Sequence, residues 1–481
     1  MKTPLMRWWL IFLSTTVLSG GLQAATAKLL VKNGLFITEK SDQAPFTGYM
    51  LVGADGKIAK IALGEPAPEL KADVVLDAKG QFIAPGFISA HSHLFMSPFR
   101  GLGHDATLYG WIEAINKMNN LSTAEDLYWF SLHGSVDFLR NGITTAYDFT
   151  YSGAVGGVAV GVGEKVAGPI LKPGPFEENQ IRAKADAGLR FIDSISIVRG
   201  GTEDDMRKRF EKVLAFARDN YSGNPLYLKM AISGNVQREP TKEAAYREAK
   251  YMHDYGVINQ THFLESPERV PEQQSKFAWY KEAGALGPGL IFGHFIQTND
   301  EIVRETAASG ASMSWQPTSN GRLASGVADI VSYRKAGIKV GVGLDDQSCT
   351  DISDPFQNLR IGLYLIRTRY KNAQSLSVKD MLYLHTLGSA EMLGIADKVG
   401  SLEEGKYADF LLVDPQNPDT GPLHDPVASY VLACGLRNLK RVYVGGELVV
   451  DGNTLVKQDE AKIHQEVYSR IGRLQAEAAK P

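Results

Sequence analysis

Cysteine is almost absent from this chain. Only Cys349 and Cys434 occur among 481 residues, and neither stands in a C-x-x-C or other metal-binding spacing. The sequence therefore excludes a disulfide-dense scaffold and a zinc site built from closely spaced cysteines. One disulfide is compatible with the count, but two separate buried thiols are favoured because the two residues lie far apart in sequence.

An excess of charge of either sign is also missing. The formal net charge is −3, 22% of the residues are charged, and the chain has no long basic run. We therefore expect no nucleic-acid partner. The hydrophobic content of 44% is typical of a globular protein, and the length predicts two or three domains.

Long apolar runs are missing except at the N-terminus. Residues 1–24 contain two cations, then an apolar run, then small residues. This order predicts a secretory signal peptide cleaved after Ala24 or Ala27. A membrane anchor is the alternative, but the run is shorter than the roughly 20 residues that spanning requires. Loss of Lys2 and Arg7 would change the net charge from −3 to −5. We expect the mature protein to be periplasmic or secreted, without a membrane attachment.

Both ends of the remaining chain are rich in short strand patterns. Residues 28–85 and 396–456 contain apolar and β-branched segments separated by Asp-Gly and Gly-Gly turns. Neither set is large enough to form a comfortable core alone. We therefore predict one discontinuous β-sandwich domain built from both ends, followed by a C-terminal helix at 457–481.

The central segment alternates between strand and amphipathic helix patterns. This succession over residues 86–395 predicts parallel strands joined by crossover helices, in the α/β class. Its length suits a (β/α)8 barrel of the TIM type, which needs about 250 residues. An open, doubly wound sheet is the alternative. Residues 152–174, rich in glycine and valine, predict no particular structure.

Residues able to bind a metal follow several of these strands. His91 and His93 lie two apart at the end of the first one, so both side chains face the same way. An isolated H-x-H pair would favour two surface histidines. However, His262, His294 and Asp345 end later strands, and the carboxyl ends of barrel strands are where active sites form. Together these positions favour a metal site.

Strand alternation distinguishes Asp345 from Asp346. Gly341, Gly343 and Asp345 form one face of the last barrel strand, and this face is expected to point to the barrel axis. Asp346 is then expected to turn away or to begin the following loop. A helix N-cap is the alternative role for Asp345.

Several motifs together resemble the amidohydrolase superfamily, in particular its branch of cytosine, guanine and S-adenosylhomocysteine deaminases and triazine hydrolases. The H-x-H element alone is weak, but the ordered set is specific. The resemblance covers nearly the whole chain after the predicted signal peptide. The matching segments are 85–94, 261–265, 293–294, 319–326, 341–345 and 400–409.

The resemblance implies a metal-dependent amidohydrolase with one divalent metal ion. Its ligands would be His91, His93, His262 and Asp345. Zinc is the favoured ion, and iron and manganese are compatible with the same ligands. A carboxylated Lys229 bridging two metals is the alternative, in which His294 would also become a ligand.

The resemblance also implies the proton-handling groups. Glu265 would shuttle a proton to the leaving group, and His294 would orient the attacking water or stabilise an oxyanion. Asp345 could accept the proton of the water while contacting the metal. Because residues three apart on a strand face opposite ways, His262 and Glu265 can share a site only if the chain turns between them. On spacing alone, Glu265 would be a solvated loop carboxylate.

Two positions are expected to contact the substrate. Trp315 stands where many relatives have a histidine, which predicts a larger or more apolar pocket wall, although core packing is the alternative. Asn320, in the motif that follows, is the second. The Asp345-Asp346 pair also departs from the Asp-Gly or Asp-Ser common in the branch.

The favoured function is hydrolytic deamination of an amino-substituted nitrogen heterocycle, with a small molecule as the only partner. The alternative is hydrolysis of an amide, carbamate, urea or chloro substituent on the same scaffold, because the fold does not determine the bond cleaved. Export and Trp315 favour this alternative. A non-catalytic metal-binding or solute-binding protein is a remote third reading. Relatives are often dimers or larger, so a homo-oligomer is compatible.

Overall fold

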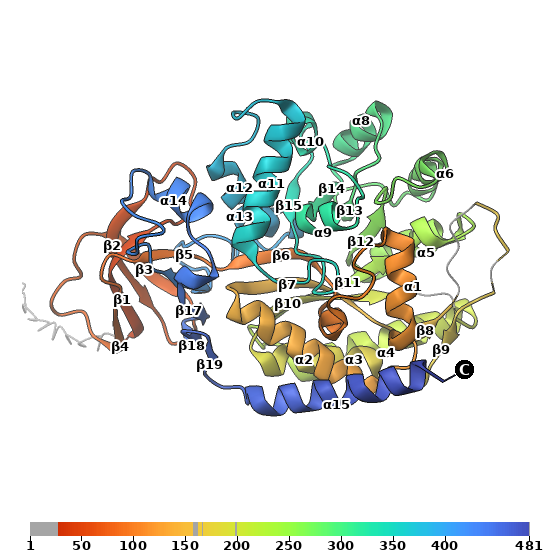
Figure 1. Ribbon diagram of the computed structural model, residues 1–481, viewed down its shortest axis with the longest axis horizontal. Helices are drawn as coiled ribbons and strands as arrows, with labels where there is room; N and C mark the ends of the chain where they lie inside the picture. The colour runs from red at the N-terminus through yellow and green to blue at the C-terminus, as the bar shows by residue number, and fades with distance from the viewer. Residues whose placement is uncertain (1–26, 157–161, 166, 198–199, 481) are drawn as a thin grey trace, which may run out of the picture.

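The protein consists of a parallel β-barrel surrounded by helices and a separate mixed sheet (Figure 1). The computed structural model describes residues 27–156, 162–165, 167–197 and 200–480, so the predicted signal peptide of residues 1–24 lies outside the described part. The architecture confirms the predicted barrel with an additional β-domain from both chain ends. Within the described ranges, no helix has the length and apolar character needed to cross a membrane.

Eight parallel strands form the barrel, each hydrogen-bonded to its neighbours in sequence order. They alternate with helices, as the sequence pattern predicted, and their apolar side chains are almost all buried. The strands are β6 (Phe87–Ser92), β7 (Ile143–Thr150), β10 (Arg190–Ser196), β11 (Tyr227–Gly234), β12 (Ile258–Phe263), β13 (Leu290–His294), β14 (Ser312–Trp315) and β15 (Val340–Val342).

The barrel closes at a seam between β15 and β6. The Asp345 amide donates to the His91 carbonyl at 3.0 Å, and the His93 amide donates to the Asp345 carbonyl at 3.2 Å. Ser92 and Asp345 also form a parallel bridge. The backbones of His91, His93 and Asp345 therefore complete the barrel. These backbone hydrogen bonds fix the distance between Asp345 and the two histidines.

Helices cover the outside of the barrel and the loops at its ends (Figure 1). Reciprocal capping boxes begin α2, α4 and α12, at Thr123, Thr202 and Ser377. The helices up to the end of the barrel are α1 (Leu108–Asn119), α2 (Ala124–Arg140), α3 (Phe176–Ala187), α4 (Glu203–Tyr221), α5 (Glu243–Tyr255), α6 (Val270–Ser275), α7 (Phe277–Glu282), α8 (Asp300–Ser309), α9 (Pro317–Arg322), α10 (Ile330–Ala336), α11 (Pro355–Tyr370), α12 (Val378–Leu384) and α13 (Leu387–Leu393).

The mixed sheet joins the two ends of the chain. Its central pairing is antiparallel, between β5 and β16, and it brings residues more than 300 positions apart into register. Phe410 and Tyr443 stack at 4.3 Å within its core. The nine described strands are β1 (Ala27–Phe36), β2 (Phe46–Val52), β3 (Ile58–Leu63), β4 (Ala72–Asp77), β5 (Phe82–Pro85), β16 (Phe410–Val413), β17 (Leu439–Val444), β18 (Glu447–Asp451) and β19 (Thr454–Leu455).

The C-terminal segments pack back onto both parts. Helix α14 (Pro426–Leu432) follows the sheet strand β16, and α15 (Glu460–Ala478) runs along α2 (Figure 1). Arg470 and Arg473 of α15 both pair with the buried carboxylate of Asp126 in the first turn of α2. The strands β8 (Ala154–Val155) and β9 (Ile170–Leu171) pair antiparallel. They lie in the segment for which the sequence predicted no structure. The cysteines are free and buried, as favoured.

Candidate metal centre and active site

Three imidazole nitrogens and one carboxylate oxygen converge at the carboxyl ends of the barrel strands. The Nε2 atoms of His91, His93 and His262 lie 3.1–3.3 Å from one another. Asp345 Oδ1 lies 3.5 Å from Nε2 of both His91 and His93. The structure thus brings together all four predicted ligands.

These separations fit a divalent metal ion. Donor atoms at about 2.1 Å from a tetrahedral zinc stand about 3.4 Å apart, close to the observed distances. Burial lowers the pKa of His91 to about 3 and holds those of His93 and His262 well below their usual range, so the rings are neutral. Three neutral nitrogens cannot all hydrogen-bond one another, whereas a cation satisfies every lone pair at once.

Two glycines make room for the His91 ring. A Cβ atom on Gly293 would lie 2.9 Å from Cε1 of His91, and one on Gly343 would lie 2.8 Å from its Cβ. Such contacts are shorter than packed carbon atoms allow. The glycines of β13 and of the segment after β15 therefore let His91 occupy the barrel axis.

Gln260 fixes the tautomer of His91. Its Nε2 donates to the Ala90 carbonyl at 3.0 Å, so its Oε1 accepts from Nδ1 of His91 at 2.5 Å. The proton on Nδ1 leaves the Nε2 lone pair free for a metal ion. Sequence reasoning missed Gln260, although its position two residues before His262 on β12 places it on the same face of that strand.

Asp345 reaches the site from a left-handed backbone position, with φ of 65°. A non-glycine residue in this region is strained and needs support from its surroundings. The two seam hydrogen bonds provide that support, and Ser319 Oγ donates to Asp345 Oδ2 at 2.6 Å. Oδ1 therefore remains directed at the histidines. The helix-cap alternative for Asp345 is wrong, and Ser319 was not predicted as a supporting residue.

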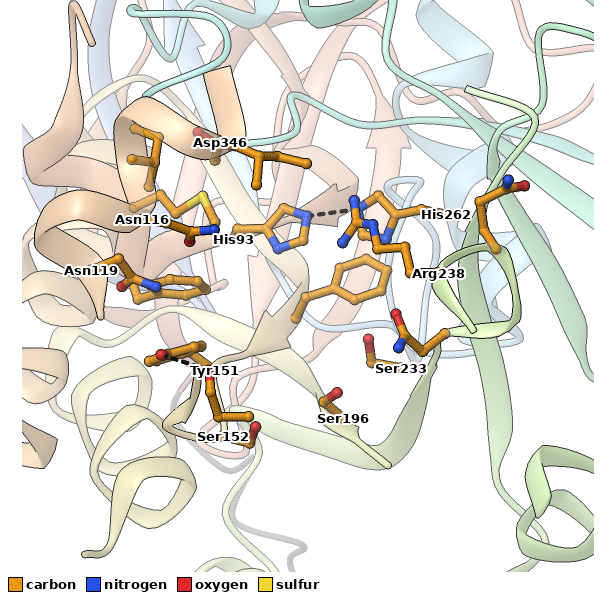
Figure 2. Close-up of a pocket in the computed structure, with 18 of the residues that line it drawn as sticks. His93, Asn116, Asn119, Tyr151, Ser152, Ser196, Ser233, Arg238, His262 and Asp346 are labelled. Carbon is orange, nitrogen blue, oxygen red and sulfur yellow. Dashed lines mark hydrogen bonds between the residues drawn. The ribbon is translucent and has the colours of Figure 1, made fainter. Parts of the chain in front are cut away.

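Asp346 begins the loop after β15, but it does not turn away from the site. Its Oδ1 accepts from the amides of Ser348 and Cys349, at 2.7 and 2.9 Å. Its side chain lines the cavity beside the metal ligands (Figure 2). Of the two expectations for Asp346, the start of the loop is right and the outward orientation is not, because the strand ends at Val342 and the alternation of side chains does not extend to this residue.

Glu265 enters the site because the chain turns after β12. The strand ends at Phe263, and Leu264 adopts φ of 56°, which reverses the direction in which the next side chain points. Glu265 is buried and lines the cavity, with Oε1 at 3.6 Å from His294 Nε2. Burial raises the pKa of Glu265 to about 7, which suits a group that both accepts and releases a proton near neutrality.

His294 ends β13 with its ring held by Asn320. Asn320 Nδ2 lies 2.8 Å from His294 Nδ1. The ring also lies near Asp345, with Nε2 at 4.0 Å from Oδ2. Asn320 is completely buried and positions His294, and its predicted contact with substrate stays a prediction.

A cavity of about 240 Å³ opens from these groups. Apolar side chains predominate on the wall that includes α1, where Asn116 and Asn119 also line the cavity, and hydroxyl, amide and guanidinium groups lie at the ends of β10 and β11 (Figure 2). The apolar side chains include Phe95, Leu108, Trp111, Ile112, Ile115 and Phe149. The polar ones include Ser196, Ser233, Asn235, Gln237 and Arg238. A small molecule with a flat or apolar body fits such a space.

Residues 82–449 match the amidohydrolase family. The chain belongs to that family. It is therefore an enzyme, a hydrolase acting on carbon–nitrogen bonds, as the motifs implied.

Relatives of this amidohydrolase align over most of its length. The 5′-deoxyadenosine deaminase of Methanobrevibacter smithii is 25% identical over 94% of this chain and 99% of its own. The 5-methylthioadenosine/S-adenosylhomocysteine deaminase of Bacillus cereus is 26% identical over 86% of this chain and 92% of its own.

Solved structures show the same fold at lower identity. A zinc-bound adenosine deaminase from Xanthomonas campestris superposes with a TM-score of 0.81 at 20% identity, covering 94% of this chain and 99% of that one. Zinc-bound atrazine chlorohydrolase from Arthrobacter aurescens gives 0.79 at 22% identity, covering 92% and 100%.

Trp315 is a core residue of the amidohydrolase and not a pocket wall. Its side chain is completely buried, and its ring packs against Gly362 of α11, where an added Cβ would lie 3.0 Å from it. It shares the outer face of β14 with the buried Met313, whereas Ser314 faces inward. The expected contact of Trp315 with substrate is therefore wrong, and the core-packing alternative is right.

Lys229 is remote from the metal ligands. It lies near the beginning of β11, and its Nζ donates to the Leu393 carbonyl at 2.7 Å. Active sites form at the opposite, carboxyl end of barrel strands. A carboxylated Lys229 cannot bridge two metals in this arrangement, so the alternative two-metal site is wrong.

Proposed function

We propose that this amidohydrolase holds one zinc ion at His91, His93, His262 and Asp345 and deaminates an adenosine-like, amino-substituted nitrogen heterocycle. The observation that carries the proposal is the placement of Glu265. A buried carboxylate with a pKa near 7 stands beside the ligand set and opens into the cavity. Simple metal storage or solute binding requires no such proton-handling group.

A divalent ion held by His91, His93, His262 and Asp345 would supply one element of the chemistry, a lowered pKa of a water molecule. Glu265 accepts a proton from the water and delivers it to the nitrogen of the scissile bond. His294 donates a hydrogen bond from Nε2 to the oxygen as charge develops there. The carbon–nitrogen bond breaks, a carbon–oxygen bond forms, and ammonia leaves with the proton carried by Glu265.

Two relatives support an adenosine-like substrate. Both align with most of this chain, and both are named for deamination of adenine-containing compounds. The aromatic side chains of Phe95, Trp111 and Phe149 line the cavity, and their faces suit a heteroaromatic ring.

Ammonia release tests the proposed reaction. The metal-loaded enzyme would be assayed with 5′-deoxyadenosine, 5′-methylthioadenosine, adenosine, guanine, cytosine and aminotriazines. Release from at least one of them, lost in Glu265→Gln while metal remains bound, supports the proposal. No release from any of them, together with cleavage of anilides or ureas, would overturn it.

Hydrolysis of an amide, carbamate, urea or chloro substituent is the second candidate function. The apolar side chains of Leu108, Ile112 and Ile115 favour it, because they suit an alkyl or other apolar substituent. Chloride or amine release from chloro- and alkylamino-triazines, without ammonia from nucleosides, would select this candidate.

We also propose that the enzyme is exported. The cationic, apolar and small-residue order of residues 1–24 supports this location. Expression with the intact N-terminus, followed by fractionation and N-terminal sequencing, tests it. A mature chain that begins after Ala24 or Ala27 in the exported fraction supports export, and an uncleaved cytoplasmic chain contradicts it.

A further inference from the structure

Arg238 places an unpaired positive charge in the active-site cavity. It ends the short 3-10 turn Val236–Arg238 that follows β11, and it lines the cavity. Its guanidinium has no hydrogen-bond or ion-pair partner among the residues that the structure describes. By contrast, Arg322 pairs with Asp351, and Arg269 pairs with Glu272.

The charge of Arg238 faces the reacting groups. Figure 2 shows its side chain running into the cavity towards the rings of His93 and His262. Its positive charge contributes to the lowered pKa values of these histidines and opposes the raised pKa of Glu265. The guanidinium therefore stands within electrostatic reach of His93, His262 and Glu265.

The surroundings of Arg238 supply hydrogen-bond donors. Ser233, Asn235 and Gln237 line the same wall, and Gln237 Oε1 accepts from the Leu264 amide at 3.3 Å. The side-chain nitrogen Nε2 of Gln237 takes no part in this bond, and it has no acceptor among the described residues. Two neighbouring residues thus present donors without acceptors, which is the chemistry that recognises an anionic oxygen group.

We propose that Arg238 determines substrate specificity by binding a carboxylate on the substrate. The planar guanidinium matches a carboxylate with two parallel hydrogen bonds, and the apolar side chains of the cavity would hold the body of the molecule. The substrate class is then a flat amine or amide that carries a carboxylate away from the bond to be cleaved. This inference rests on the proposed function for the reaction, but it assigns a separate part of the cavity.

Binding of a matched pair of probes tests the role of Arg238 without turnover. Indole-3-carboxylate and indole-3-carboxamide have the same shape and differ in charge. Their dissociation constants would be measured by calorimetry on the metal-loaded enzyme. Because a carboxylate can also contact the metal, the informative quantity is the acid-to-amide preference compared between wild type and Arg238→Gln.

We expect the wild type to prefer the carboxylate by about tenfold or more, as for a hydrogen-bonded charge pair, and Arg238→Gln to lose this preference. Arg238→Lys should keep only part of it, because an ammonium lacks the two-pronged geometry. Arg269→Gln is the matched control: it removes the same charge from an exposed, already paired arginine and should keep the wild-type preference.

Two results would overturn the inference. The acid-to-amide preference could be equal in wild type and Arg238→Gln, and if both probes also weakened by the same factor, the role of Arg238 would be structural. Binding of phenylphosphonate could depend on Arg238 while binding of benzoate does not. The group that Arg238 recognises would then be phosphate-like and not a carboxylate. Failure of ammonia release would contradict the proposed deamination but would not change the result of the probe-binding experiment. Failure of the proposed function and failure of the Arg238 inference are therefore distinguishable.

Discussion

Asn320 Nδ2 stands 2.8 Å from Nδ1 of His294, and this contact fixes where the imidazole proton lies. An amide nitrogen only donates, so Nδ1 accepts and the proton of the neutral ring is on Nε2. Nε2 is buried and has no hydrogen-bond partner among the described residues, and it faces Glu265 at 3.6 Å. The ring is thus preset as a hydrogen-bond donor and not as a metal ligand.

Reversing the polarity of this contact should remove that donor. Asn320→Asp puts a carboxylate opposite Nδ1, which favours the proton on Nδ1 and turns Nε2 into an acceptor. We expect kcat to fall by about a hundredfold, as for the loss of one oxyanion donor, with unchanged metal content. Steady-state kinetics and nitrogen NMR of the His294 ring check both parts. Unchanged kcat with the proton moved to Nδ1 would remove His294 from the mechanism.

Gly293→Ala should disturb the metal site through His91. The new Cβ would lie 2.9 Å from Cε1 and 3.0 Å from Nδ1 of that ring, which must then shift. We expect weaker metal binding and a loss of about 1–3 kcal/mol in the free energy of unfolding. Gly321→Ala is the control, because a Cβ there meets nothing within 4 Å. Equal metal affinity and stability in both variants would contradict the packing argument.

Gln260→Leu should weaken metal binding without removing a ligand. The substitution leaves Nδ1 of His91 without its acceptor, so the ring loses its preferred tautomer and orientation. Loss of such a supporting group typically costs about 10- to 100-fold in metal affinity. Competition with a chromophoric chelator measures this change. Wild-type affinity in the variant would show that the barrel alone orients His91.

The pH profile of kcat/KM should report Glu265. Burial raises its pKa to about 7, and a bound divalent cation would draw it down, so the ionised base is lost as the pH falls through a value at or below about 7. Activity should therefore rise with pH across that value and level off above it. Glu265→Asp retains a carboxylate base on a shorter side chain, so its activity should be lower but should still rise with pH. A profile that instead falls with rising pH would identify the protonated form of Glu265 as the active one.

The positions of the ligands could be predicted from sequence because strand ends and strand alternation determine them. His91 and His93 share a face, and the ends of parallel strands meet at one side of a barrel. The sequence placed Glu265 in the site only on the condition that the chain turns before it. The turn depends on a positive φ at Leu264, and leucine is not a residue type that indicates a positive φ. The role of Glu265 was therefore predicted from the resemblance to the amidohydrolase superfamily.

The errors have equally local causes. Trp315 was predicted to line the pocket because many relatives have a histidine at this position. However, Trp315 shares a face of β14 with Met313 and alternates with Ser314, and this pattern already indicated the core. Asn320, Gln260 and Ser319 act through other side chains across the barrel. Such contacts depend on which strands become neighbours in space, which sequence spacing does not reveal. Arg238 follows a strand end, as the ligands do, but an isolated arginine carries no motif.

Metal analysis of the purified enzyme tests the central claim most directly. The convergence of three Nε2 atoms and Asp345 Oδ1, together with the remote position of Lys229, supports the proposal of one divalent ion per chain. Plasma emission spectrometry should find close to one equivalent of zinc, retained in Lys229→Ala and lost in His93→Ala. Two equivalents, or one that survives the loss of His93, would contradict the account.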